Sequence, residues 1–304
     1  MVSSLKVEEL TKDILEDSTS GAAQLTIKAA DTFLKLLEGK PTSRSVKKLV
    51  KKLAEIRPSM PSIANMAYRI SALIDEQVAE GVSLEDAIES AVRSAVKEYR
   101  ERVKGVIEHA SRRLGKYSSV LTHSYSSTLI TAIELCKKLK IYVTESRPGC
   151  EGRWLAEKLA EKGFNVTLIV DSAASYIIDE GEVDAVVTGC DAILYDCSIV
   201  NKIGTKMVAL AASEAGIPFF VITDLWKAAI HGFSLEEHPP GEVYDGDVKN
   251  LSAVNPYFEI VPARLITSFI TEEGVLKPSK LGKVLAKLWG YVPRGERKLS
   301  KSTI

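Results

Sequence analysis

The spacing of hydrophobic residues changes near residue 115 of this 304-residue chain. Before that point apolar side chains recur every three or four positions, which is the period of an amphipathic helix. The clearest stripe runs from Leu84 to Leu114, and Ser83 with Asp86 has the spacing of a capping box. It predicts one helix of roughly 45 Å, at about 1.5 Å per residue, that ends at Gly115 as its C-cap. Earlier helices are expected at residues 7–17, 21–37, 43–56 and 63–78.

After Gly115, short apolar runs alternate with helical stretches. The apolar runs lie at residues 118–123, 141–145, 166–170, 185–188 and 219–223, and the helices at residues 127–139, 152–162, 172–179 and 205–215. Such runs, with little alternation, are typical of strands that are buried on both faces of a parallel sheet. The pattern predicts an α/β protein: a helical N-terminal domain, residues 1–115, followed by a Rossmann-like doubly wound parallel sheet domain, residues 116–304. A loop rich in proline and glycine is expected at residues 231–257.

The composition excludes several classes of function. Forty basic residues balance forty acidic ones, so net charge favours neither a nucleic-acid nor a membrane partner. The apolar runs are far shorter than the roughly 20 residues of a membrane span, and the N-terminus does not resemble a signal peptide. The cysteines, which are Cys136, Cys150, Cys190 and Cys197, have neither CxxC spacing nor the density of a disulfide scaffold. We expect a cytoplasmic protein with reduced thiols, without a metal site or a cofactor.

Polar residues collect where the predicted strands end. In open parallel sheets, ligands bind outside the carboxyl ends of the strands. The four candidate ends are "THSYSS" at 122–127, "TESRPGCEGR" at 144–153, "GCDAILYDCSIVNKIGT" at 189–205 and "TDLWK" at 223–227.

The first of these ends brings hydroxyl groups to the start of a predicted helix. Ser126, Ser127 and Thr128 lie where free backbone N–H groups and the helix dipole favour an anion such as phosphate. A simple N-cap role for Ser126 or Ser127 is the alternative. His123 beside Ser124 does not predict a serine hydrolase, because neighbouring residues on a strand face opposite sides and no G-x-S-x-G motif is present.

Two later strand ends supply further candidates. Asn201 and Lys202 suit a phosphate or a sugar hydroxyl, and Lys227 is either a second cation over the same crevice or a surface lysine. Asp191 directly follows a predicted strand, where a carboxylate can move a proton or cap a turn.

Five segments of the second half resemble a known family. They are "VLTHSYSS", "VTESRPGCEGRWLAEKL", "VDSAASYII", "TGCDAILYDCSIVNKIGT" and "PFFVITDLWK". In this order they resemble the superfamily of translation initiation factor 2B alpha, beta and delta subunits, which includes ribose-1,5-bisphosphate isomerase and methylthioribose-1-phosphate isomerase. The resemblance covers the whole chain and is strongest from about residue 121 to residue 227. It implies a helical N-terminal domain and a Rossmann-like C-terminal domain that mediates dimerisation.

The resemblance to the isomerases also implies a site. The phosphosugar ligands would be Gly21, Ala22, Arg57, Ser126, Ser127, Thr128, Asn201, Lys202 and Lys227. Asp191 matches the catalytic acid of the isomerases, and Ser124 occupies the position of their proton-carrying Cys.

This Ser124 argues against catalysis. A thiol near pKa 8.5 can become a thiolate, whereas a serine hydroxyl has no comparable anion within reach, and each pKa unit of mismatch costs about 1.4 kcal/mol. Ser20 also replaces the Arg that the isomerases carry before the Gly-Ala turn. A second thiol, that of Cys150 or Cys190, is a weaker substitute.

The sequence therefore predicts a non-catalytic regulatory or assembly protein that resembles the alpha subunit of the initiation factor. It would bind a phosphorylated sugar or a nucleoside monophosphate, associate with initiation factor 2 subunits, and form a homodimer or higher homo-oligomer. One alternative is an aldose–ketose isomerase of the ribose-1,5-bisphosphate type, with Asp191 in the acid–base role. Another is a scaffold whose helical domain binds an initiation-factor subunit.

Overall fold

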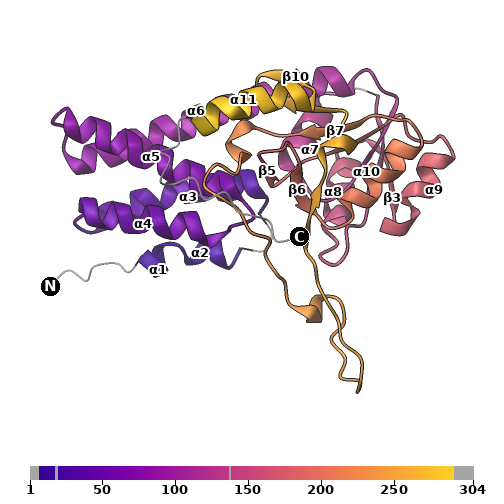
Figure 1. Cartoon of the computed structure of the whole chain (residues 1–304), viewed down its shortest axis with the longest axis horizontal. Coiled ribbons are helices and arrows are strands. Elements are labelled where there is room, and N and C mark those ends of the chain that lie inside the picture. The colour runs from indigo at the N-terminus through magenta and orange to yellow at the C-terminus, as the bar shows by residue number, and fades with distance from the viewer. Residues whose placement is uncertain (1–6, 18–19, 137, 291–304) are drawn as a thin grey trace.

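The computed structural model describes residues 7–17, 20–136 and 138–290, and its helical and sheet parts lie side by side (Figure 1). The helical part consists of α1 (Val7–Leu10), α2 (Lys12–Leu15), α3 (Ala22–Lys35), α4 (Ser43–Ile56), α5 (Pro61–Ala79) and α6 (Leu84–Leu114). The single helix expected at residues 7–17 is wrong. Thr11 lies in a turn between α1 and α2, and its hydroxyl donates to the carbonyl of Val7. Residues 1–6 and 291–304 of the predicted domains lie outside the described residues.

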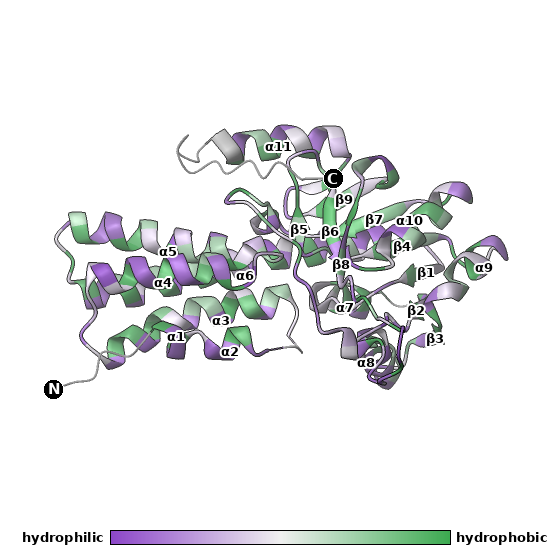
Figure 2. Ribbon diagram, turned by 60° about the horizontal axis from the view of Figure 1, so that its bottom comes forward, coloured by the Kyte–Doolittle hydropathy of each residue, from purple (hydrophilic) through white to green (hydrophobic). Residues whose placement is uncertain are grey.

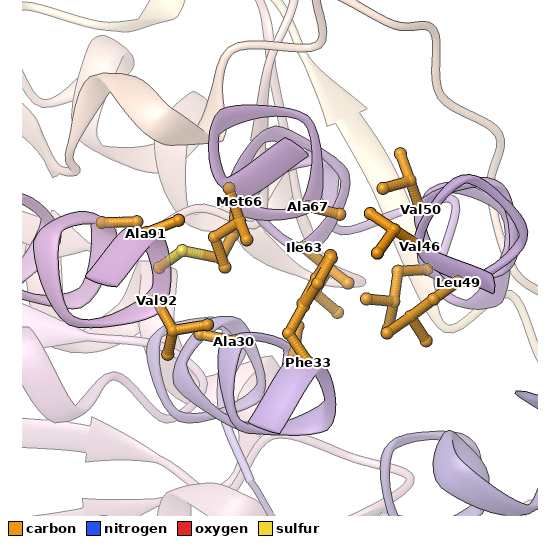
Figure 3. Close-up of a cluster of buried hydrophobic side chains, with 14 of the residues drawn as sticks. Ala30, Phe33, Val46, Leu49, Val50, Ile63, Met66, Ala67, Ala91 and Val92 are labelled. Carbon is orange, nitrogen blue, oxygen red and sulfur yellow. The ribbon is translucent and has the colours of Figure 1, made fainter. Parts of the chain in front are cut away.

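The helical part is held together by an apolar core between α3, α4, α5 and α6 (Figure 3). Phe33, Leu49, Ile63 and Met66 are completely buried there, and Ala91 of α6 lets the helices approach closely. Burial of each large side chain contributes roughly 1.5–3 kcal/mol. The periodicity of the sequence predicted this core because each helix presents one apolar stripe to it.

Helix α6 belongs to both parts of the molecule. Tyr99 packs in the helical core, whereas Val106 and Ala110 pack against the sheet. The side chain of Ser83 accepts a hydrogen bond from the backbone N–H of Asp86, so the predicted N-cap is confirmed. Gly115 ends the helix in the right-handed conformation, and the division of the chain into domains at this residue stays a prediction.

The central sheet has the doubly wound order. Its strands are β1 (Ser119–Thr122), β2 (Lys140–Thr144), β3 (Asn165–Ile169), β4 (Ala185–Thr188), β7 (Phe219–Ile222), β9 (Ser268–Thr271) and β10 (Gly274–Leu276). They are arranged as β10-β9-β7-β4-β1-β2-β3, and every neighbouring pair is parallel except β9 with β10. The chain leaves β1 toward one edge and returns to β4 on the other side, so the switch point, where such sheets bind ligands, lies between β1 and β4.

Helices cover both faces of this sheet. They are α7 (Ser127–Glu134), α8 (Glu151–Glu161), α9 (Ala174–Asp179), α10 (Thr205–Glu214) and α11 (Pro278–Gly290). Side chains alternate along the strands: Val120 of β1 packs with α6, α7 and α8, and Leu121 packs with α9, α10 and α11. Figure 2 shows hydrophobic residues concentrated in the central strands and mixed surfaces on the covering helices.

Three features of the fold differ from the sequence prediction. Strand β3 is an edge strand, and Leu168 on it is 46% exposed, so burial on both faces is wrong for this strand. A second, antiparallel sheet is formed by β5 (Ala192–Ile193), β6 (Ile199–Lys202) and β8 (Phe258–Val261). Its strands are too short, or too close to turn residues, to give a clear period. The strands β9 and β10, at one side of the central sheet, were also missing from the prediction.

The stretch at residues 231–257 is a long excursion that projects from the body of the molecule (Figure 1). Only short elements interrupt it within the described residues, among them the 3-10 helix η4 (Pro240–Glu242). Over the part of the chain that the structure describes, no helix is long and apolar enough to span a membrane.

Candidate active site

A cavity of about 420 Å³ lies at the carboxyl ends of the strands, between the helical part and the sheet part. Ser124 follows β1, Asp191 follows β4, and both line the cavity at the switch point of the sheet. The helical part contributes Gly21 and Arg57 to the wall, and the excursion contributes Tyr257. We call this space the wide cavity.

A narrow cavity of about 20 Å³ adjoins the wide one. Gly21, Ser124, Tyr125 and Asp191 line both, so the two spaces meet along these residues. The other predicted ligand residues on its wall are Ala22, Ser126, Ser127, Thr128, Asn201 and Lys227. The structure thus brings all the candidates together at one place, with Arg57 and Lys202 on the wide cavity.

Two helices begin at the narrow cavity. Gly21 is the N-cap of α3, and Ser126 is the N-cap of α7, where its hydroxyl accepts from the backbone N–H of Leu129 at 3.3 Å. Neither helix has an acidic residue in its first turn. Two positive dipole ends without a compensating carboxylate favour an external anion. The N-cap role of Ser126 and an anion site are therefore compatible.

Gly189 keeps the end of β4 close to the start of α7. A Cβ atom at this position would lie 3.1 Å from Oγ of Ser126 and 3.2 Å from its Cβ. Such contacts are tight, so a side chain at position 189 would push Ser126 away by a few tenths of an ångström.

Two buried lysines face the cavities. Lys227 is only 7% exposed, and its Nζ donates to the carbonyl of Cys190 at 2.7 Å. Lys202 is 2% exposed; its Nζ lies 3.1 Å from Oε1 of Glu151 and 3.2 Å from the ring centroid of Tyr257. Burial lowers the pKa of Lys202, and the Glu151 carboxylate opposes that shift. Neither lysine is the solvated surface residue that the sequence left open.

Asp191 has the chemistry of an acid near neutral pH. Burial raises the pKa of its carboxyl from 3.8 to about 6, although Lys227 and Lys202 pull the pKa down. Glu151 raises the pKa further by charge repulsion. At pH 7 a group with this pKa still carries a proton about a tenth of the time, which is the range that proton transfer requires.

Ser124 has an unusual conformation and a carboxylate partner. Its φ is +68°, and its backbone N–H donates to Oγ of Ser146 at 2.8 Å. Its own hydroxyl donates to Oε1 of Glu151 at 3.0 Å. A non-glycine residue in the left-handed region is uncommon and is often found at functional sites.

The thiols of Cys150 and Cys190 do not take the place of the thiolate that Ser124 cannot form. Burial raises the pKa of the Cys190 thiol to about 12, so this thiol stays protonated at neutral pH. Cys150 is not among the described residues that line either cavity, and its thiol donates to the carbonyl of Pro148.

His123 has a structural role. Its Nδ1 lies 2.7 Å from Oγ1 of Thr144, and its Nε2 lies 2.7 Å from the carbonyl of Ile203. Burial lowers the pKa of the imidazole, so it stays neutral near pH 7. The ring also fills the space beside Gly204, whose φ is +99°.

Arg57 is less available to a ligand than the sequence predicts. Its guanidinium donates to Glu236 of the excursion at 3.2 Å and to the backbone carbonyls of Ile14, Leu15 and Asp17. These bonds tie the segment before α3 and the excursion to the end of α4. A phosphate group of a ligand would have to compete with the Glu236 carboxylate for the Arg57 guanidinium.

Sequence reasoning missed the residues that line the far side of the wide cavity. They are Trp154, His238, Glu242, Tyr257 and Phe258, together with Glu151. Glu151 lies in "TESRPGCEGR", a strand end that the pattern flagged without singling out this residue. The others lie on helix α8, on β8 or in the excursion, where no strand-end rule applies. His238 stacks on Tyr257 with 3.6 Å between ring centroids.

The fold and the site define a doubly wound α/β protein with an anion-binding cleft at the switch point. The chain belongs to the initiation factor 2 subunit family, whose family model matches residues 18–278. It is 33% identical to ribose 1,5-bisphosphate isomerase of Methanocaldococcus jannaschii over 254 residues, which are 80% of each chain. It is 32% identical to methylthioribose-1-phosphate isomerase 1 of Pseudothermotoga lettingae, covering 78% of this chain and 75% of that one.

A solved structure has the same fold. The translation initiation factor eIF-2B of Pyrococcus horikoshii OT3 superposes with a TM-score of 0.77 at 26% identity, covering 90% of this chain and 97% of that chain. The Rossmann-like fold predicted from the sequence is therefore confirmed.

The prediction of a non-catalytic regulatory protein is wrong. Relatives that match about four fifths of the chain are named as isomerases, which supports the alternative drawn from the sequence. The prediction considered only thiols, at position 124 or at Cys150 and Cys190, as the proton carrier beside Asp191, whereas further carboxylates line the same cavity. The expected association with initiation factor 2 subunits depended on that interpretation and loses its basis.

Proposed function

We propose that the protein is an aldose–ketose isomerase that acts on a ribose carrying a phosphate on carbon 1. The names of the two relatives share this chemical feature and differ elsewhere on the sugar. The observation that carries the proposal is the Asp191 carboxyl, which has a pKa of about 6 and lines both cavities beside two helix N-termini.

The two cavities divide the substrate between them. We place the phosphate where the narrow cavity, which has room for about one water molecule, opens into the wide cavity, close to the starts of α3 and α7 and to the ammonium of Lys227. The sugar then occupies the wide cavity, where polar groups such as Lys202 and Glu151 lie near its hydroxyls. Asp191 lies where the two spaces meet, next to carbon 1 and carbon 2 in this arrangement.

The reaction needs an acid first. In the closed ring, carbon 1 bears both the ring oxygen and the phosphate oxygen. The protonated Asp191 gives its proton to the ring oxygen as the bond from carbon 1 to that oxygen breaks. A lone pair of the oxygen that joins carbon 1 to the phosphate stabilises the positive charge that develops on carbon 1 as the ring opens.

The hydrogen shift follows. A base removes the proton from carbon 2, and the electron pair of that bond forms a double bond between carbons 1 and 2. Carbon 1 then takes up a proton while the hydroxyl on carbon 2 returns its proton to the Asp191 carboxylate, which leaves a carbonyl at carbon 2. Atoms and electrons balance without any other reactant, and Asp191 regains the proton that it gave.

Turnover tests the proposal. The purified protein is incubated with ribose 1,5-bisphosphate and with 5-deoxyribose 1-phosphate, and the ketose product is measured. We expect product from at least one of them, and a loss of about 10²- to 10⁴-fold in kcat for Asp191→Asn. Failure to form ketose from either sugar, under conditions in which the protein is folded, would refute the isomerase assignment. The expected homo-oligomer stays a prediction that light scattering tests.

A further inference from the structure

The proposed reaction requires a base for the proton on carbon 2, and Ser124 cannot supply it alone. A serine hydroxyl forms no anion near neutral pH, and the buried Cys190 thiol has a pKa of about 12. Asp191 serves as the acid. The base has to be sought among the other described groups that line the wide cavity.

Three other carboxylates line this cavity, and two of them are held elsewhere. Asp17 forms an ion pair with Lys28. Glu242 lies on the excursion, where it accepts from Nδ2 of Asn255 at 2.9 Å and its side chain is 39% exposed. Asp17 is therefore neutralised by a lysine, and Glu242 lies at the exposed edge of the site.

Glu151 is held in a different way. One carboxylate oxygen, Oε1, accepts from the hydroxyl of Ser124 at 3.0 Å and lies 3.1 Å from Nζ of Lys202. The other oxygen, Oε2, is buried and has no hydrogen-bond partner within the described residues. Oε2 is therefore an unsatisfied acceptor, enclosed by protein, in a residue that lines the wide cavity, and a small turn of the carboxylate is needed before a substrate can contact it.

Positive groups also lie close to the Glu151 carboxylate. Glu151 is the first residue of α8, so it lies at the positive end of the helix dipole. The neighbouring Lys202 is almost completely buried, and Glu151 is its ion-pair partner at 3.1 Å. The side chain of Glu151 is only 12% exposed, which limits water around it.

Resting on the proposed isomerase function, we propose that Glu151 is the catalytic base, and that its carboxylate removes the proton from carbon 2 and delivers it to carbon 1. Ser124 and Lys202 are positioning residues that hold Oε1. Glu151 is neutral after the first transfer and a carboxylate after the second, so the proton is conserved. A carboxylate thereby takes the part that a thiolate would play at position 124.

A glutamine at this position separates catalysis from packing. Glu151→Gln keeps the shape of the side chain and a carbonyl that accepts from Ser124, but it cannot take up the proton. We expect kcat to fall about 10²- to 10⁴-fold, while KM and the inhibition constant of inorganic phosphate change less than about threefold. Glu157→Gln on the exposed side of α8 is the matched control and is expected to keep wild-type kcat.

Two further variants keep the test decisive. Glu151→Asp retains the charge but withdraws the carboxylate by one methylene, and we expect at least a tenfold loss of kcat even if the glutamine variant does not fold. Ser124→Ala removes one contact of Oε1 and leaves the base in place, so its loss of kcat is expected to be at least tenfold smaller than that of Glu151→Gln.

The outcomes separate the two proposals. If the wild-type protein forms no ketose, the isomerase function fails and this inference with it. If the wild-type protein is active and Glu151→Gln retains more than a third of its kcat, only the role of Glu151 is refuted. A loss for Ser124→Ala equal to that of Glu151→Gln, or weakened phosphate inhibition by Glu151→Gln, would also overturn it.

Discussion

The narrow and wide cavities differ in the groups that the chain places on them. The narrow cavity is lined by the starts of α3 and α7, by hydroxyl groups and by Lys227. The wide cavity is lined by carboxylates and by aromatic rings such as Trp154 and Tyr257. The narrow cavity combines two helix ends and a lysine with one carboxylate, that of Asp191, whereas the carboxylates of the wide cavity outnumber its lysine and arginine.

This difference suggests a division of labour between groups that bind the substrate and groups that transfer its protons. Backbone N–H groups and a buried lysine recognise an anion by charge, whatever sugar it carries. Carboxylates with constrained surroundings, Asp191 and Glu151, can instead move protons. The common part of the substrate therefore belongs at the narrow cavity, and the variable part belongs at the wide one.

The strongest test of this division removes the cation of the narrow cavity. Lys227→Met is expected to raise KM about 10- to 100-fold, because a hydrogen bond to a charged group contributes about 1.5–3 kcal/mol. The inhibition constant of inorganic phosphate should rise by a similar factor, measured by competition in the isomerase assay. Lys283→Met, at an exposed position on α11, is the control. Unchanged phosphate inhibition would place the anion elsewhere.

The next test concerns stability. Burial raises the pKa of Asp191 from 3.8 to about 6, so the folded state holds this proton more tightly than the unfolded state does. The resulting stabilisation is complete below about pH 4 and is lost as the pH rises through about 6. At pH 7 the ionised carboxylate destabilises the fold by about 1–3 kcal/mol, at about 1.4 kcal/mol per pKa unit. Asp191→Asn should therefore be more stable than wild type at pH 7 and equally stable near pH 4.

Urea unfolding at the two pH values measures this effect. Asp75→Asn, at an exposed position on α5, is the matched control and should change the free energy of unfolding by less than about 0.5 kcal/mol at either pH. An Asp191→Asn gain of the same size at pH 4 and pH 7 would mean that ionisation of Asp191 is not its cause.

The wide cavity should distinguish substrates that carry a charged phosphate on carbon 5 from substrates that do not. Asp17 and Glu242 line it, and Arg57 already binds Glu236, so a second phosphate finds more repulsion than attraction. We expect kcat/KM for 5-deoxyribose 1-phosphate to exceed that for ribose 1,5-bisphosphate by about tenfold, or about 1.4 kcal/mol. Rates at low substrate concentration for both sugars give this ratio. A preference for the bisphosphate would show that the carboxylates of the wide cavity do not repel it.

The sequence predicted the narrow cavity better than the wide one, for a physical reason. Ser126 and Lys227 lie within five residues of the ends of β1 and β7, so the rule that ligands bind at the carboxyl ends of strands was enough to select them. Asn201 lies within β6, a strand that the pattern did not predict. The pattern also predicted the helical core, because Phe33 of α3 and Leu49 of α4 each belong to an apolar stripe with helical spacing.

The wide cavity depends on long-range contacts that no local pattern contains. Tyr257 and Glu242 reach it through the excursion at residues 231–257, whose path is set by tertiary contacts such as the bonds of Glu236 to Arg57 and Ser59. The hydrogen bond from Ser124 to Glu151 joins the segment after β1 to the start of α8, and no local sequence pattern predicted it. A resemblance marked position 124 as a lost thiol, and only the fold shows the carboxylate beside it.

The smallest expected effect concerns the pair that links the excursion to the helical part. Glu236→Gln leaves a side chain that can accept from Ser59 but removes the negative charge 3.2 Å from Arg57. The guanidinium then carries an uncompensated charge at the wide cavity. Arg57 keeps its bonds to the backbone carbonyls of Ile14, Leu15 and Asp17. The preference for 5-deoxyribose 1-phosphate over the bisphosphate should therefore fall only about two- to fivefold, or about 0.4–1 kcal/mol. Any change in the pKa of Asp191 affects both sugars alike and cancels in this ratio. Glu237→Gln, the exposed neighbour, should leave the ratio unchanged. If Glu236→Gln also leaves it unchanged, Arg57 does not face the substrate, and repulsion by the carboxylates alone sets the specificity.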